Sequence, residues 1–148
     1  MTVSAGENEV ISLREFDYPR ELVFEAWKNP EQLARWWGPK GFTNTFHEFD
    51  FKPGGQWRFV MLGPDGVDYP NHSVFEEIVP WERIVLHHLN TPEFQIIATF
   101  EEAGGRTRMT WRQRFMKAAV FEQVKTYVIE ANEQNFDRLS DLLTECSE

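Results

Sequence analysis

The sequence predicts an α+β fold in which a curved antiparallel sheet of six or seven strands wraps around one long C-terminal helix, with two short helices after the first strand. Short alternating segments recur across the middle of the chain at intervals of about ten residues and are separated by turn residues. Two segments near the start have helical spacing, and a segment without Gly or Pro closes the chain. At 148 residues, we expect a single domain over residues 1–148, large enough to bury a core.

The first strand is predicted at residues 10–17, where apolar and polar residues alternate weakly. Tyr18-Pro19 ends this strand, and the proline suits the first turn of a helix, because its missing N–H costs nothing there. Apolar residues at helical spacing follow until Asn29-Pro30, where a second short helix begins that ends at Gly38-Pro39. The sequence therefore predicts two short helices that meet at an angle.

A series of strands is predicted next, because Pro-Gly-Gly, Gly-Pro-Asp-Gly and Gly-Gly clusters separate alternating segments in the way typical of an antiparallel meander. Alternation is clearest in the last strand, where four arginines occupy the face opposite the apolar residues. We therefore expect one face of the sheet to be covered and the other to be solvated. The expected covered face of the last strand carries Thr107, Met109, Trp111, Gln113 and Phe115.

The closing segment, residues 117–145, is predicted to form one long amphipathic helix, because apolar residues recur in it at steps of three or four. At 1.5 Å per residue this helix would be roughly 40 Å long, enough to cross the sheet. Its expected buried stripe comprises Phe121, Val124, Val128, Ala131, Asn135, Leu139, Leu142 and Cys146.

Aromatic residues make up 15% of the chain, with 13 Phe and 6 Trp. Large rings rarely pack without gaps, so this composition suits a domain with an interior cavity at least as well as one with a solid core. Ligand sites are mostly apolar, and we expect this cavity to bind a small apolar or aromatic molecule. The candidate ligand-binding residues are Trp36, Trp37, Trp57, Phe59, Met61, His72, His88, Phe94, Ile96, Met109, Trp111, Gln113, Val124, Val128 and Asn135, and Ala98 and Ala131 are expected beside them.

Trp36 and Trp37 are adjacent, and adjacent residues of a helix point about 100° apart. We expect one indole to pack beneath the helix and the other to line the mouth of the cavity, although both could be ordinary core residues. Gln113 and Asn135 are candidates for orienting a ligand, because a buried amide without a partner costs about 1–3 kcal/mol. The alternative is a mutual or backbone hydrogen bond inside a filled core.

The histidines are candidates for acid–base groups, so an enzymatic function is an alternative to ligand binding. His87 and His88 are adjacent, so they point to opposite faces of a strand, and no metal-ligand spacing occurs in the sequence. We expect no metal and no cofactor. His72 or His88 could face the cavity as a general base or as a hydrogen-bond anchor, or could be satisfied elsewhere.

Adjacent carboxylates give a second candidate acid or base. In a regular strand, one of Glu76 and Glu77 points inward. An inward carboxylate could transfer protons to or from a bound substrate, unless it pairs with an arginine such as Arg58.

Net charge is −9, which argues against nucleic acid and anionic membranes as partners, because both attract clustered positive charge. The single cysteine, Cys146, fits a reducing cytoplasm. The start does not resemble a signal peptide, and no apolar stretch approaches the roughly 18 residues of a membrane span. We therefore expect a cytoplasmic protein without membrane insertion, whose row of arginines is a salt-bridged outer face or a patch for a partner.

Four runs of the sequence match a known family: FDYPRELVFEAWKNPEQLARWWGPKGF, DFKPGGQWRF, GPDGVDYPNHSVFEEIVPWERIV and NFDRLSDLL. Through these runs, residues 16–143 resemble the family related to the activator of the heat-shock-protein-90 ATPase. This family belongs to the START-like, helix-grip (SRPBCC, pollen-allergen-type) superfamily. The resemblance implies the strand–helix–helix–strands–helix order and an apolar cavity between the sheet and the long helix.

The activity that the resemblance implies is broad, because the superfamily includes lipid carriers, polyketide cyclases and resistance proteins that bind their drug. A binding module is the leading expectation. A cavity-based enzyme with proton-transfer chemistry, of the cyclase or hydrolase kind, is the alternative. The third possibility is a protein-interaction domain, either a chaperone ATPase co-regulator or a homodimer. Within the family, the chaperone-activating role belongs to larger proteins with an additional N-terminal domain.

Overall fold

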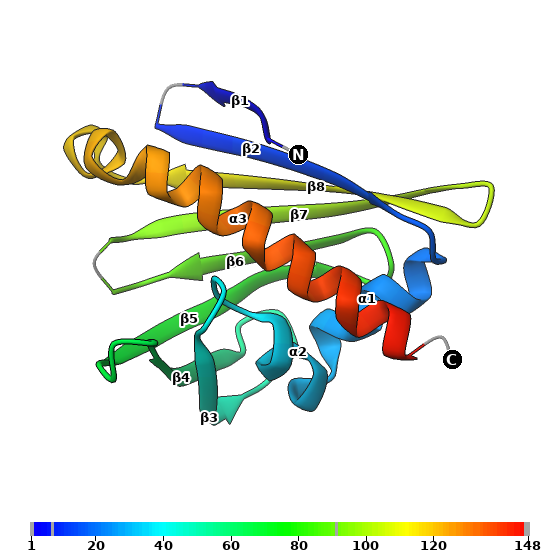
Figure 1. Ribbon diagram of the computed structural model, residues 1–148, viewed down its shortest axis with the longest axis horizontal. Coiled ribbons are helices and arrows are strands. Elements are labelled where there is room, and N and C mark those ends of the chain that lie inside the picture. Colours follow the sequence, from blue (N-terminus) through cyan, green and yellow to red (C-terminus); the bar gives the residue numbers. More distant parts are fainter. Residues whose placement is uncertain (1, 7, 91, 147–148) are drawn as a thin grey trace.

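The computed structural model describes residues 2–6, 8–90 and 92–146, and over these residues α3 lies across one face of an antiparallel sheet (Figure 1). The elements are β1 Thr2–Gly6, β2 Glu9–Phe16, α1 Arg20–Lys28, α2 Pro30–Trp36, β3 Thr43–Phe49, β4 Gln56–Leu62, β5 Asp68–Val79, β6 Arg83–His88, β7 Phe94–Ala103, β8 Arg106–Phe115 and α3 Ala118–Cys146.

The sheet has the strand order β1-β2-β8-β7-β6-β5-β4-β3. Strands β3 to β8 form a meander, and β2 pairs with β8, the last strand of that meander. The helix-grip fold predicted from the sequence is confirmed. The described sheet has eight strands, one more than the upper predicted number, because β1 pairs with β2 as an additional edge strand, so the two short helices follow the second strand.

The two short helices begin and end where the sequence predicts. Asn29 starts α2, and its side-chain oxygen accepts hydrogen bonds from the backbone N–H groups of Glu31 and Gln32, at 2.9 and 3.3 Å. Pro30 occupies the first turn. Trp36 ends the helix, and Trp37 has extended backbone geometry, with φ −70° and ψ 130°. The adjacent indoles therefore leave the backbone in different directions.

Arg14 of β2 forms ion pairs with α3. Its guanidinium forms ion pairs with Glu133 at 3.1 Å and with Asp137 at 3.0 Å. The same group lies over the ring of Phe136, 5.6 Å from its centroid. These contacts hold the middle of α3 over the β2 side of the sheet.

The outer face of the sheet carries ion pairs, as one of the two alternatives predicts. Arg106 pairs with Asp17 at 2.6 Å, and Arg112 pairs with Glu9. Such exposed pairs each contribute roughly 0–1 kcal/mol, so they mark a solvated face more than a source of stability. None of the described helices combines the length and the apolar character that crossing a membrane requires.

Candidate functional site

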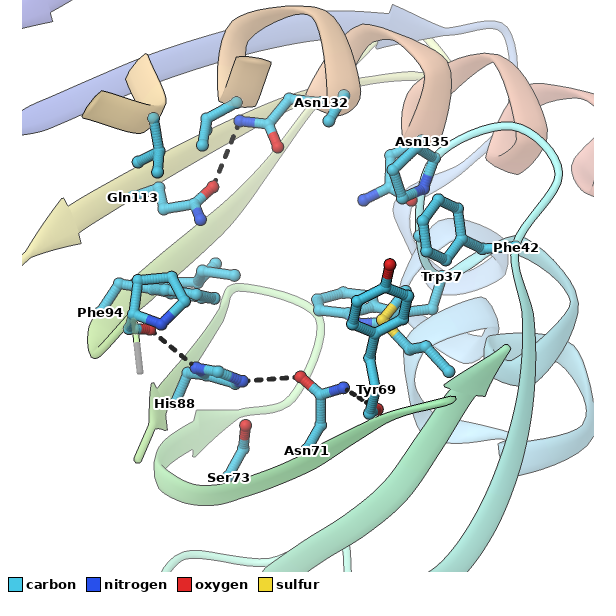
Figure 2. Close-up of a pocket in the computed structure, with 18 of the residues that line it drawn as sticks. Trp37, Phe42, Tyr69, Asn71, Ser73, His88, Phe94, Gln113, Asn132 and Asn135 are labelled. Atoms are coloured by element: carbon cyan, nitrogen blue, oxygen red, sulfur yellow. Dashed lines mark hydrogen bonds between the residues drawn. The ribbon is translucent and has the colours of Figure 1, made fainter. Parts of the chain in front are cut away.

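A cavity of about 600 Å³ lies between the first half of α3 and the covered face of the sheet (Figure 2). Aromatic and aliphatic side chains make up most of its wall. Among the lining residues, Asp68, Tyr69, Pro70 and Tyr127 are exposed, and they mark where the cavity opens to solvent. The volume lies within the range of about 300–1,000 Å³ that is usual for small-molecule sites.

Most of the predicted ligand-binding residues line this cavity. They come from the end of α2, from the strands β4, β6, β7 and β8, and from the first half of α3. Their role in binding stays a prediction. The predicted residues in the lining are Trp37, Phe59, Met61, His88, Phe94, Ile96, Trp111, Gln113, Val124, Val128 and Asn135, together with Ala131.

Two predicted tryptophans do not line the cavity. Trp36 is fully buried, and its indole N–H donates to the carbonyl oxygen of Ala26 at 2.9 Å, so it secures α2 against α1. Trp57 lies one layer deeper than expected, because it stacks on Phe59 at 4.4 Å and meets Trp37 at 5.0 Å. The alternation of β4 predicts that Trp57 lies on the covered face of the sheet. It does not predict that the rings of Phe59 and Trp37 separate Trp57 from the cavity.

Three other predicted positions also lie outside the lining. Met109 and Ala98 are fully buried in the main core cluster. His72 is half-buried, and its Nε2 contacts Oε1 of Gln56. Its neighbours Asn71 and Ser73 line the cavity from β5, so the alternation of this strand turns His72 away.

Trp37 forms the boundary between the cavity and the solid core. Its indole stacks on Trp111, with centroids 5.2 Å apart, and meets Trp27 edge-on at 5.5 Å. It is 8% exposed, whereas Tyr69 at the opening is 41% exposed. As expected, one of the adjacent indoles, Trp36, packs in the core and the other, Trp37, lines the cavity. Trp37 lies at the inner end of the cavity, however, and not at its mouth.

The loop that follows Trp37 is held in place by Arg138 of α3. The guanidinium donates to the carbonyl oxygens of Arg35 at 2.7 Å, Gly38 at 2.8 Å and Pro39 at 3.0 Å. A cation suits the C-terminal end of α2, where backbone carbonyls lack helical partners. Burial lowers the pKa of Arg138 below its ordinary value.

Gly38 allows this loop to pass close to the sheet. Its φ is +98°, and a Cβ at this position would lie 2.4 Å from Cε of Met61. Glycine suits this backbone conformation, and a Cβ here would also displace the flexible end of the Met61 side chain. Gly38, Pro39 and Phe42 thereby form one wall of the cavity.

Buried amides form the wall that faces the rings. Oε1 of Gln113 accepts from the indole N–H of Trp111 at 3.1 Å and from Nδ2 of Asn132 at 3.3 Å. Nδ2 of Asn132 also lies 3.3 Å from the hydroxyl of Ser12. The alternative of a mutual bond between Gln113 and Asn135 is not found among the described residues, and Oδ1 of Asn135 is buried without a described partner.

His88 lines the cavity from β6 and stacks on Phe94, with ring centroids 4.5 Å apart. Its Nδ1 lies 3.0 Å from the carbonyl oxygen of Pro92, and its Nε2 lies 2.6 Å from Oδ1 of Asn71. The amide of Asn71 is oriented by its own donation to the carbonyl oxygen of Tyr69 at 2.8 Å (Figure 2). Both ring nitrogens of His88 therefore face acceptors supplied by the protein.

Burial lowers the pKa of His88 below its ordinary value, although backbone hydrogen bonds with Pro92 and Asn90 oppose this effect. A neutral imidazole has a single N–H, so it donates to one of its two acceptor neighbours at a time. His87 points to the opposite face, as predicted from adjacency, and its Nε2 lies 2.6 Å from Oε2 of Glu93.

The prediction that one of Glu76 and Glu77 points into the cavity is wrong. The pairing of β5 with β6 shifts register between Phe75 and Glu77, and both carboxylates are exposed. A bulge of this kind places two successive side chains on one face, which an argument from regular alternation cannot foresee. Glu77 pairs with Arg83, and Glu76 accepts a hydrogen bond from Gln95. Arg58, the partner suggested from the sequence, pairs with Glu48 instead.

Some lining residues were not among the sequence candidates. Asn132 follows Val128 by one helical turn, so helical spacing could have identified it. Ser73 pairs directly with His88 across β5 and β6, a relation that required the register. Within the described parts of the chain, no three side chains of His, Cys, Asp or Glu are grouped as a metal site would require. Other lining residues not predicted are Phe42, Tyr69, Asn71, Leu86, Phe115 and Tyr127.

Comparison with known proteins places this fold in one family. Residues 17–144 match the family described as Activator of Hsp90 ATPase homolog 1-like protein, in agreement with the resemblance over residues 16–143. No curated protein matches the chain significantly.

Solved structures similar to this chain share its fold at low sequence identity. A protein from Arthrobacter aurescens is 22% identical, with a TM-score of 0.90 over 98% of this chain and 91% of the other. One from Nitrosomonas europaea is 21% identical, with a TM-score of 0.86 over 97% and 99%. One from Mycobacterium smegmatis is 24% identical, with a TM-score of 0.85 over 99% of both. On the match over residues 17–144, this chain belongs to the family of Activator of Hsp90 ATPase homolog 1-like proteins.

Proposed function

We propose that this protein binds a small hydrophobic or aromatic molecule in the cavity between α3 and the sheet. The observation that carries the proposal is a cavity of about 600 Å³ with a mainly apolar wall and an opening to solvent. A hollow of this size is costly to retain, because filling it with side chains would gain dispersion contacts and bury more apolar surface.

Ring faces in the wall support an aromatic guest. Trp37 and Trp111 stack on each other at the inner end, and Phe94 and His88 stack at the sheet. Aromatic pairs in offset or edge-to-face arrangements contribute about 0.5–1.5 kcal/mol beyond the area that they bury. A flat ligand placed among these rings would gain such contacts on several sides.

The groups available for proton transfer favour binding over catalysis. Both ring nitrogens of His88 face protein oxygens, so the lone pair of the unprotonated nitrogen is not directed at a substrate. Glu76 and Glu77 lie outside the cavity, and the carboxylate in the described lining, Asp68, is exposed at the opening. A general base must lie within reach of the proton that it removes.

The proposal is tested with N-phenyl-1-naphthylamine, an uncharged probe whose fluorescence rises in apolar surroundings. We expect saturable enhancement with the wild-type protein and competition by other uncharged aromatic compounds and lipids. Ala131→Trp would occupy the cavity and abolish enhancement while the protein stays folded by circular dichroism, because Ala131 lines the hollow. Ala119→Trp is the matched control, because Ala119 is an exposed position of α3.

Absence of enhancement with the wild type, or equal enhancement with Ala131→Trp, would contradict the proposal. The cytoplasmic location, a homodimer and a chaperone partner stay predictions. Light scattering tests the dimer, and a pull-down with the chaperone tests the partner.

A further inference from the structure

We propose that the ligand of this cavity is an uncharged aromatic molecule that carries a hydrogen-bond donor beside an acceptor on one edge, as a carboxamide or a lactam does. This inference rests on the proposed binding function and adds the chemistry of the ligand. It starts from three buried amides, Gln113, Asn132 and Asn135, that line the cavity from β8 and α3 (Figure 2).

Gln113 offers a donor to the cavity. Its Oε1 already accepts from Trp111 and from Asn132, which fixes the orientation of the amide. Its Nε2 has no acceptor among the described residues, and Figure 2 shows it directed into the cavity. A side-chain amide carries two N–H donors, so a ligand oxygen placed here would receive a hydrogen bond without displacing a protein contact.

Asn132 offers an acceptor, and Asn135 adds a third amide to this wall. Asn132 uses Nδ2 for both of its hydrogen bonds, to Gln113 and to Ser12, so its Oδ1 accepts from no described donor. An amide oxygen in a mainly apolar wall is rarely left without a donor, so this oxygen indicates a ligand N–H or O–H. Asn135 is 6% exposed, and its Oδ1 has no described partner and is covered by protein atoms, out of reach of a ligand.

The charges around the cavity disfavour an anionic ligand. Among the described lining residues there is no Lys and no Arg. His88 lies on the wall opposite the amides, where its ring nitrogens face Pro92 and Asn71 (Figure 2). A carboxylate in contact with the amides would lose its hydration without gaining a cation, which is unfavourable.

The test uses four naphthalenes of nearly equal shape: 2-naphthamide, 2-acetylnaphthalene, 2-isopropylnaphthalene and 2-naphthoate. Their affinities are measured by displacement of N-phenyl-1-naphthylamine at pH 8. We expect 2-naphthamide to bind at least about tenfold more tightly than 2-isopropylnaphthalene, a factor that corresponds to about 1.4 kcal/mol. 2-Acetylnaphthalene, which only accepts, should bind with intermediate affinity, and 2-naphthoate should bind most weakly.

Asn135→Leu separates recognition from folding. The side chain is similar in size, and Oδ1 of Asn135 has no described partner to lose, so we expect unchanged or higher thermal stability. The preference for 2-naphthamide over 2-isopropylnaphthalene should fall at least about threefold, because one of the amides that line the cavity is gone. Gln123→Leu, at an exposed position of α3, should leave the preference unchanged.

Equal affinities for 2-naphthamide and 2-isopropylnaphthalene, or an unchanged preference in Asn135→Leu, would overturn this inference and leave the proposed function standing. A wild-type protein that binds neither the probe nor any naphthalene would overturn both.

Discussion

The two halves of α3 cover the same sheet with different results. Residues 136–143 bury large side chains in the main core, whereas most of the side chains that residues 124–135 present to the cavity are small or polar. The difference shows that side-chain size along one helix decides where this fold is solid and where it is hollow. The packed residues are Phe136, Leu139, Leu142 and Leu143, and the cavity residues are Val124, Val128, Ala131, Asn132 and Asn135.

The short helices account for the rest of the difference. Trp27 of α1 meets Trp36 at 5.1 Å and Trp111 at 5.4 Å, so α1 and α2 fill the space under the second half of α3 with rings. This filled region ends at Trp37, and the cavity begins on the other side of its indole.

The largest expected effect comes from one substitution made in both regions. Leu139→Ala removes a fully buried side chain from the solid core and should lower the free energy of unfolding by about 3–5 kcal/mol. Leu86→Ala removes a side chain that is equally buried but lines the cavity, and should cost only about 2 kcal/mol, because its environment already contains the void. Urea denaturation measures both. Equal losses would mean that the cavity is filled in solution.

An intermediate effect is expected where the loop crosses the edge of the cavity. Gly38→Ala should destabilise by about 1–3 kcal/mol, mainly from its positive φ, with a smaller cost for displacing the flexible end of Met61. Gly66 has a φ of +81°, and nothing lies within 4 Å of the place that its Cβ would take. Gly66→Ala should therefore lower stability only through the strain of a positive φ in a residue other than glycine. Thermal unfolding of both variants isolates the cost of displacing Met61. A Gly66→Ala variant that is more costly than Gly38→Ala would contradict this ranking.

The smallest effect concerns pH. Because burial lowers the pKa of His88 in the folded state, the unfolded chain binds the extra proton first as the pH falls. The contribution of neutral His88 to stability is therefore complete above about pH 6.5 and is lost between that pH and the lowered folded pKa. The slope in this window is at most about 1.4 kcal/mol per pH unit.

The matched variants are His88→Gln and His47→Gln, the second at an exposed position. Unfolding free energies between pH 5 and 8 should depend less on pH in His88→Gln than in the wild type, and should follow the wild type in His47→Gln. His72 and His87 also act on His88 through their charge, so the slope is compared only between these variants. The same slope in His88→Gln and the wild type would contradict the assignment.

Much of the fold follows from the sequence, because its signals are local. Asn29-Pro30 and Gly38-Pro39 mark the limits of α2, and the alternation of β8 places Trp111 and Gln113 on the covered face. Helical spacing likewise places Val128 and Asn135 under α3. These positions depend on the period of one element alone.

The parts of the site that the sequence did not yield depend on relations between elements. The bulge that turns Glu76 outward arises in the pairing of two strands. The depth of Trp57 depends on where Trp37 and Phe59 lie. The partners of Asn132 include Ser12, 120 residues away in sequence, and no local pattern reports such a contact.

The most direct test of a hollow that accepts a guest is an NMR measurement of intermolecular nuclear Overhauser effects between N-phenyl-1-naphthylamine and the methyl groups of the protein. Binding in the cavity predicts contacts to Val128 and Ile96 and none to Leu139 or Leu142. Contacts confined to exposed residues such as Leu89 and Met116 would contradict the account.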